Sequence, residues 1–135
     1  MQTAPIPQAL TTLDALEREG LTDPALRPAL EAVAGEFKVR VSPAMASVAV
    51  PGVRAQFLPD ARELRVIAEE LADPIGDDAH RPVAGLTHRY PDRAILHATQ
   101  TCEVYCRFCF RRETVGEAGT LAEAEFDRVL DYLAA

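Results

Sequence analysis

The stretch AILHATQTCEVYCRFCFRR, residues 94–112, joins a short apolar run to a segment that holds all three cysteines of the 135-residue chain. The run at 94–99 is bounded by turn-forming residues, which predicts a strand buried on both faces. Cys102, Cys106 and Cys109 follow at spacings of four and three residues. A short irregular loop with these spacings can turn three sulfurs toward one centre. The stretch therefore predicts a strand that leads into a metal-binding loop.

Two kinds of metal centre accept three cysteines. A four-iron cluster takes one ligand on each iron, so three cysteines leave one iron open for chemistry. Zinc accepts three cysteines with one histidine, and His88 and His97 are the conceivable fourth ligands. Structural zinc sites usually pair two C-x-x-C motifs from separate loops, so the pattern favours the cluster. A non-catalytic iron–sulfur or zinc module stays open as the alternative.

A purely structural role as buried core thiols is disfavoured by the charge of the segment. Glu103, Arg107, Arg111 and Arg112 surround the cysteines, and such side chains are seldom fully buried. We therefore expect the segment to lie outside the hydrophobic core.

The cysteine spacing with Phe108 between the last two ligands, C-x3-C-x-aromatic-C, resembles the cluster loop of radical S-adenosylmethionine enzymes. The longer segment PVAGLTHRYPDRAILHATQTCEVYCRFCFRRETVG, residues 82–116, is similar to the lysine 2,3-aminomutase family. The specific part is GLTHRYPDR followed by CRFCFRR. A weaker resemblance extends to residues 41–50 and 71–78.

The resemblance implies an isomerase that moves the 2-amino group of L-lysine to C3 and gives β-lysine. Its implied cofactors are a [4Fe-4S] cluster, S-adenosyl-L-methionine as the source of a 5′-deoxyadenosyl radical, and pyridoxal 5′-phosphate. Its implied partners are the amino acid substrate, an electron donor for the cluster, and further copies of the complete protein in a homo-oligomer. Glutamate and arginine 2,3-aminomutases share the cluster loop, so the substrate stays open, as does a radical S-adenosylmethionine activity without pyridoxal phosphate.

The resemblance also implies roles for single residues. The three cysteines match the cluster ligands, and Phe108 matches a position whose side chain lies near the adenine of S-adenosylmethionine. Arg111 matches the arginine that binds the substrate carboxylate, a task suited to a planar guanidinium. Arg89 and Tyr90 match positions close to pyridoxal phosphate.

Other residues depart from the family pattern or have an ordinary alternative. Asp92 and Arg93 are explained equally well by an ion pair that fixes the turn before the strand. The family's lysine that binds pyridoxal phosphate lies downstream, and the single lysine here, Lys38, matches no motif. We therefore expect an N-terminal fragment that does not turn over substrate alone.

Composition limits the function further. The net charge of −7 argues against nucleic-acid binding. No apolar run approaches about 18 residues and no signal peptide follows Met1, which predicts a protein without membrane association, located in the cytoplasm, where thiols stay reduced. Residues 81–112 nevertheless hold six arginines against two acidic residues, which suits small anionic ligands.

The remaining pattern predicts mostly helices. We expect a helix from a Thr11 capping box to Gly20, one from the Thr22-Asp23-Pro24 start through Phe37, and a short one capped by Ser42. Residues 50–60 form a connecting loop, and a helix begins at Asp60 and ends before Pro74. A final helix follows a cap at Thr120.

These elements define the expected fold class. We expect an α/β protein: a helical N-terminal region at residues 1–80, then the first β/α unit of an incomplete radical-SAM (TIM-like) barrel at 81–135. In such barrels the active site lies at the carboxyl ends of the strands, where the cysteine loop would begin.

Overall fold

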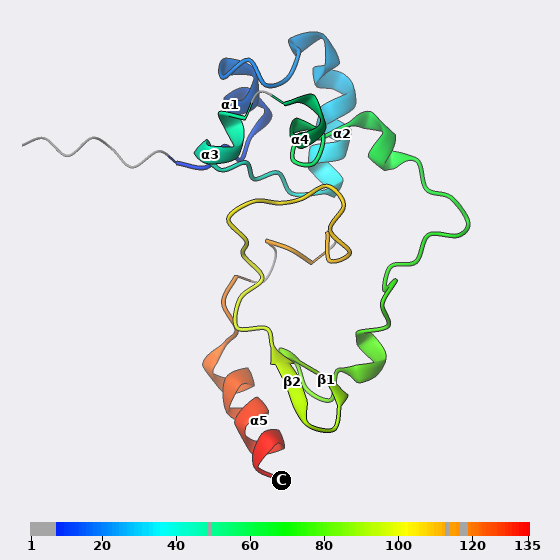
Figure 1. Ribbon diagram of the computed structural model, residues 1–135, viewed down its shortest axis with the longest axis vertical. Helices are drawn as coiled ribbons and strands as arrows, with labels where there is room; N and C mark the ends of the chain where they lie inside the picture. Colours follow the sequence, from blue (N-terminus) through cyan, green and yellow to red (C-terminus); the bar gives the residue numbers. More distant parts are fainter. Residues whose placement is uncertain (1–7, 49, 113, 117–118) are drawn as a thin grey trace, which may run out of the picture. The chain divides into compact units, whose positions relative to one another are not determined.

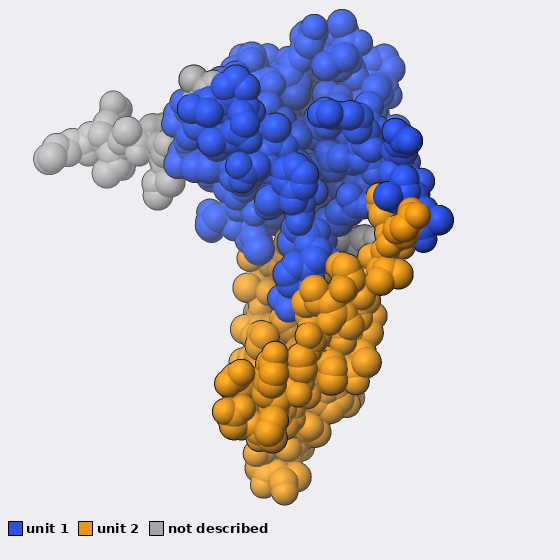
Figure 2. All heavy atoms as spheres, turned by 45° about the vertical axis from the view of Figure 1, so that its right-hand side comes forward, with its two compact units in different colours: residues 1–68, 102–112 blue, residues 69–101, 113–135 orange. Residues whose placement is uncertain are grey.

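The computed structural model describes residues 8–48, 50–112, 114–116 and 119–135. The chain divides into two compact units (Figure 2). Unit 1 combines residues 1–68 with the cysteine segment 102–112, and unit 2 combines residues 69–101 with 113–135. The sequence boundary at 80/81 stays a prediction.

Unit 1 is built from short helices (Figure 1). They are α1 (Leu13–Arg18), η1 (Pro24–Leu26), α2 (Arg27–Glu36), α3 (Pro43–Ala46), α4 (Pro51–Arg54) and η2 (Ala61–Leu64).

Side-chain caps explain where several of these helices begin. The Asp23 carboxylate accepts from the Ala25 N–H at 2.9 Å, and the Ser42 hydroxyl accepts from the Met45 N–H. Both starts were predicted. The first helix is capped by Thr12, which accepts from the Ala15 N–H, so the expected cap at Thr11 is wrong by one residue. Each cap satisfies a backbone N–H that the helix itself leaves without a partner.

The core of unit 1 lies between α1, α2 and the extended segment that follows α2. It contains Leu13, Leu16, Leu30, Val39 and Val41. The segment after α2 is held at Val41, which forms an antiparallel bridge with Leu10 through N–H···O bonds of 2.8 and 2.9 Å. Apolar burial of this kind provides most of the driving force for folding.

Two predictions for residues 50–73 are wrong. The predicted loop contains α4, and the helix predicted from Asp60 to before Pro74 is reduced to the 3-10 turn η2. Arg65 already has φ −83° and ψ 98°, outside the helical region. Val66 and Ile67 are β-branched and lose χ1 freedom in a helix, and Ile67 and Leu71 are 47% and 68% exposed. Burial therefore does not compensate for the low helix propensity of this segment.

Unit 2 contains η3 (Asp78–His80), β1 (Leu86–Tyr90), β2 (Arg93–Leu96) and α5 (Glu123–Ala134). The strands β1 and β2 form an antiparallel two-stranded sheet in which Leu86 is opposite Leu96 and Tyr90 is opposite Arg93. Pro91 and Asp92, both common in turns, form the connection. The described residues are thus a mixture of helices and a small sheet, as an α/β chain requires.

The predicted strand at 94–99 is wrong in extent and in burial. β2 ends at Leu96, and Ile95 and Leu96 are 55% and 41% exposed. The apolar run pairs with β1 through a tight hairpin, and this antiparallel pairing covers one strand edge without burying both faces.

The last helix is present, but its predicted cap is not. Ala122 occupies the N-cap without a side-chain bond, while Thr120 forms an isolated bridge with Thr99. Val129 is the buried residue of α5. No helix in the described ranges has the length and apolar character needed to cross a membrane.

Candidate cluster-binding loop

The cysteine segment of unit 1 is an irregular loop stabilised by tight turns. The Cys109 N–H donates to the Cys106 carbonyl at 3.1 Å, and the Arg112 N–H donates to the Cys109 carbonyl at 3.1 Å. Consecutive turns reverse the backbone without a helix. The last two cysteines therefore lie on a compact, turning segment, as the sequence predicted.

Two backbone bonds attach this loop to the rest of unit 1, one on each side of Cys106. The Tyr105 N–H donates to the Arg40 carbonyl at 2.9 Å, and the Arg107 N–H donates to the Gln56 carbonyl at 2.7 Å. The Tyr105 side chain is also buried.

The Arg107 side chain makes the attachment stronger. It is 8% exposed, and its Nε and Nη2 donate to the Glu63 carboxylate at 3.0, 3.1 and 2.7 Å. Its Nη1 donates to the Lys38 carbonyl at 2.9 Å. Arg107 is thus buried although it is charged, because a carboxylate and a carbonyl accept from its guanidinium.

The three cysteines are free thiols. Cys102 is exposed, whereas Cys106 and Cys109 are partly buried. The Cys109 sulfur accepts a hydrogen bond from the Arg111 N–H at 3.4 Å, an interaction of the kind that tunes iron–sulfur clusters.

The donor set fits a cluster in its chemistry, since it consists of three free thiols on one loop, one of them with an N–H directed at its sulfur. Across the described ranges, however, no three Cys, His, Asp or Glu side chains lie close enough together to hold a metal ion. Binding a cluster would therefore require the cysteine side chains to converge.

Beside the loop lies a hollow of about 420 Å³ lined by Phe108, Arg112 and residues from the segment 55–63. The Phe108 ring is 78% exposed. An exposed aromatic ring at the rim of a hollow can stack on a planar ligand, which is compatible with its expected place near an adenine.

The two arginines that follow the last cysteine each stack on an aromatic ring. Arg111 lies over Phe110 at 4.9 Å, and Arg112 lies over Phe37 at 4.3 Å. Such contacts hold a guanidinium in place while its N–H edges can still donate. Arg111 is thus positioned on the loop within two residues of Cys109.

Arg89 and Tyr90 belong to unit 2. Arg89 forms an ion pair with Asp77 at 3.1 Å and also donates to the Ile75 carbonyl. The Tyr90 ring, 49% exposed, has the Arg93 guanidinium over it at 4.4 Å. Both residues lie on β1, so the hairpin sets their positions.

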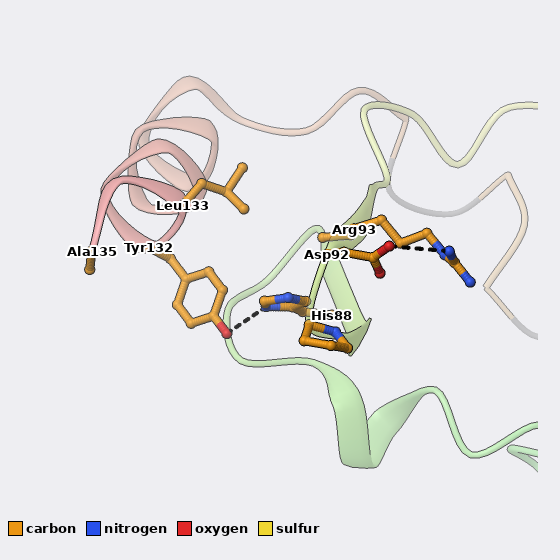
Figure 3. Close-up of a pocket in the computed structure, with 8 residues that line it drawn as sticks. His88, Asp92, Arg93, Tyr132, Leu133 and Ala135 are labelled. Atoms are coloured by element: carbon orange, nitrogen blue, oxygen red, sulfur yellow. Dashed lines mark hydrogen bonds and ion pairs between the residues drawn. The ribbon is translucent and has the colours of Figure 1, made fainter.

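A second hollow, of about 490 Å³, lies between the hairpin and α5 in unit 2 (Figure 3). At its edge the His88 imidazole and the Tyr132 hydroxyl form a hydrogen bond of 2.8 Å. Asp92 and Arg93 form the exposed ion pair that the turn suggested, at 3.5 Å. His97, the other conceivable zinc ligand, is hydrogen-bonded to the Thr87 hydroxyl at 2.9 Å.

Sequence reasoning missed the pairing of Glu63 with Arg107. The available signal was the capping-box pattern from Asp60 to Glu63, which places the carboxylate at the start of η2. The pattern could not show that the same carboxylate also accepts from an arginine 44 residues away.

Comparisons with known proteins agree with the resemblance read from the loop. No protein-family model matches the chain. Curated relatives include L-lysine 2,3-aminomutases and a glutamate 2,3-aminomutase.

The L-lysine 2,3-aminomutase of Clostridium subterminale is 45% identical over 82 residues, which are 60% of this chain and 20% of that enzyme. The L-lysine 2,3-aminomutase of Bacillus subtilis is 39% identical over 82 residues, 60% of this chain and 17% of that enzyme. The glutamate 2,3-aminomutase of Clostridioides difficile is 31% identical over 110 residues, 77% of this chain and 26% of that enzyme. The similarity to lysine 2,3-aminomutases is confirmed, and the chain spans about a fifth of the length of the first of these relatives.

Proposed function

We propose that the chain is the cluster-binding part of a radical S-adenosylmethionine aminomutase that converts L-lysine to β-lysine. The observation that carries the proposal is the set of three free cysteines on one anchored loop. The similarity to lysine and glutamate 2,3-aminomutases supports the reaction class. The proposal also includes residues 81–135 as the first β/α unit of a radical-SAM (TIM-like) barrel.

In this function the thiolates of Cys102, Cys106 and Cys109 would hold three irons of a [4Fe-4S] cluster. When bound, the cluster with S-adenosylmethionine supplies radical hydrogen abstraction, and pyridoxal phosphate supplies the carrier for the migrating amino group. The exposed Phe108 ring would contact the adenine, and Arg111 would bind the substrate carboxylate through its planar N–H edge. The backbone N–H of Arg111 would stabilise the Cys109 thiolate, since it already donates to that sulfur.

The hairpin residues would serve the phosphate cofactor. Arg89 and Tyr90 would lie near pyridoxal phosphate, with Asp77 fixing the direction of the Arg89 side chain. Pyridoxal phosphate, the carrier of the amino group, needs a lysine to which it binds covalently. The sole lysine of the 135 residues, Lys38, matches no family motif, so we expect no turnover by this chain alone.

The proposal also includes the electron donor, the oligomeric state and the cellular compartment of the enzyme. An electron donor would reduce the cluster, and the complete protein would form a homo-oligomer. The compartment would be the cytoplasm, where reduced thiols persist.

The first test is anaerobic reconstitution of the chain with iron and sulfide, followed by electron paramagnetic resonance of the reduced protein. The proposal expects a four-iron signal that changes when S-adenosylmethionine is added, because the open iron binds it. Zinc as the bound metal, or a cluster signal indifferent to S-adenosylmethionine, would contradict the proposal and support a structural module.

The second test concerns the substrate. The complete gene product, reconstituted with cluster and pyridoxal phosphate, is incubated separately with L-lysine, L-glutamate and L-arginine, and the products are separated by chromatography. The proposal expects the 3-amino isomer from lysine. The 3-amino isomer of glutamate or arginine alone would transfer the proposal to that substrate.

A further inference from the structure

We propose that the buried pair of Glu63 and Arg107 is a positioning device that fixes the cysteine loop for cluster binding. The inference rests on the proposed function, but it concerns residues to which that function assigns no role. Glu63 would act through Arg107, so both are positioning residues rather than catalytic ones.

The first step of the argument is the place of Arg107 in the loop. It follows Cys106 directly and stands two residues before Cys109. Its backbone N–H and its guanidinium together reach three acceptors outside the loop: the Gln56 carbonyl, the Lys38 carbonyl and the Glu63 carboxylate. A large shift of this residue would break several of these bonds.

The second step is that Glu63 is itself held in place. Its Oε1 accepts a hydrogen bond from the Asp60 backbone N–H at 2.8 Å, which completes the capping box of η2. The carboxylate thus serves the helix start and the loop at once. Because its side chain is only 11% exposed and that of Arg107 6%, water cannot easily replace either partner.

The third step compares this pair with other ion pairs of unit 1. Arg62 and Asp60 are 87% and 45% exposed, and Arg27 and Glu17 are 32% and 17% exposed. Removing one partner of a buried pair leaves an uncompensated charge and is strongly destabilising, whereas exposed pairs contribute little. The most buried of these pairs is therefore the one that anchors the cysteine loop.

The test is the alkylation rate of each cysteine in the metal-free chain, measured with iodoacetamide and peptide mass spectrometry. In Glu63→Gln we expect Cys106 to react about tenfold faster relative to Cys102, since release of Arg107 lets the loop open locally. Cys102 is an internal reference because it is already exposed.

The matched control is Glu17→Gln, which weakens the Arg27–Glu17 pair of the same unit, a pair that involves no residue of the loop. This variant should lower thermal stability without changing the Cys106 to Cys102 ratio. An unchanged ratio in Glu63→Gln, or an equal rise in Glu17→Gln, would overturn the proposal. If circular dichroism shows that Glu63→Gln does not fold, the same comparison is decided with Glu63→Asp, which keeps the charge on a shorter side chain.

A second readout is spectroscopic. After reconstitution, Glu63→Gln should lose or broaden the cluster signal while Glu17→Gln keeps it. If the unsubstituted chain takes up no iron, the proposed function fails, and the alkylation ratio still decides whether the pair positions the loop.

Discussion

Cys106 is the cysteine whose two sequence neighbours are both hydrogen-bonded to the rest of unit 1. It lies between Tyr105 and Arg107, whose N–H groups donate to the Arg40 and Gln56 carbonyls. Its position is therefore set by two anchors, whereas Cys102 lies before both and is exposed. A ligand held in this way has less conformational freedom to lose when a metal binds.

Replacement of Cys106 tests its role as a ligand. Cys106→Ala should reduce iron retained after reconstitution and gel filtration by about tenfold or more, because the remaining two thiolates cannot hold a four-iron cluster. Iron and sulfide are measured colorimetrically. Glu103→Gln, an exposed change in the same loop, should retain iron like the unsubstituted chain; equal retention by Cys106→Ala would exclude it as a ligand.

Asp60 gives unit 1 a defined response to acid. Hydrogen bonds from the Arg62 side chain and backbone lower the pKa of Asp60 from 3.8 to about 2. Because the folded state has the lower pKa, this carboxylate stabilises the fold above about pH 4, and the contribution is lost as the pH falls toward 2.

The corresponding variant is Asp60→Asn, which cannot ionise. The stability difference between the parent and Asp60→Asn, measured by urea unfolding, should shrink by about 0.5 kcal/mol between pH 5 and pH 2, a small value because the pair is largely exposed to solvent. Glu31→Gln, an exposed change in α2, serves as the control. A difference that is constant over this range would contradict the assigned shift.

Among the elements of unit 2, Gly85, just before β1, lies close to Leu121, which precedes α5. Gly85 precedes β1 with φ +81°, a conformation that side chains rarely adopt, and its carbonyl accepts the His97 N–H at 2.8 Å. A Cβ at this position would lie 2.7 Å from the Leu121 side chain. Glycine is required here both for its backbone conformation and for the space it leaves.

Gly85→Ala should therefore destabilise unit 2 by about 2 kcal/mol. Hydrogen exchange of the Leu86 and Val129 amides measures the effect inside unit 2. Gly35→Ala is the matched control, since an added Cβ at Gly35 in α2 would meet no atom within 4 Å beyond its chain neighbours and the backbone of its own helix; it should stabilise α2 by about 0.5 kcal/mol. Unchanged exchange in Gly85→Ala would show that Leu121 moves aside without cost.

Two helix starts, at Asp23 and Ser42, were predicted correctly, whereas the burial of the strand at 94–99 was not. Asp23 and Ser42 cap their helices as the sequence indicated, because a cap is a contact between residues two or three positions apart. The helix expected after Asp60 stops at Leu64. Leu64, Ile67 and Leu71 follow helical spacing, but their burial depends on which partners pack against them, and periodicity does not encode these partners.

In the molecule as a whole, the irregular segment 65–73 runs from the end of η2 in unit 1 into unit 2, which begins at Glu69. Val66 and Leu71 in this segment are 76% and 68% exposed. The cysteine segment, equally irregular, is anchored by Tyr105 and Arg107. Of these two irregular segments, the cysteine segment is thus held by hydrogen bonds to the rest of unit 1, whereas 65–73 has exposed apolar side chains. Limited proteolysis should distinguish them.

Limited digestion with trypsin should cut after Arg65 well before it cuts after Arg107. The expectation follows because cleavage needs an exposed, locally unfolded backbone, and Arg107 is held by Glu63 and two carbonyls. Mass spectrometry of early fragments gives the order. In Arg65→Gln the first fragment should vanish; early cleavage at Arg107 would contradict the anchoring.

The sequence by itself determined the cysteine loop, the caps at Asp23 and Ser42, and the similarity to lysine 2,3-aminomutases. These features are local, since ligand spacing and capping involve residues only a few positions apart. Only the tertiary structure decided that β2 pairs antiparallel with β1 and that Arg107 is buried against Glu63. The physical reason is that burial and ion pairing join residues distant in the chain, and their free energy depends on partners that no short pattern specifies.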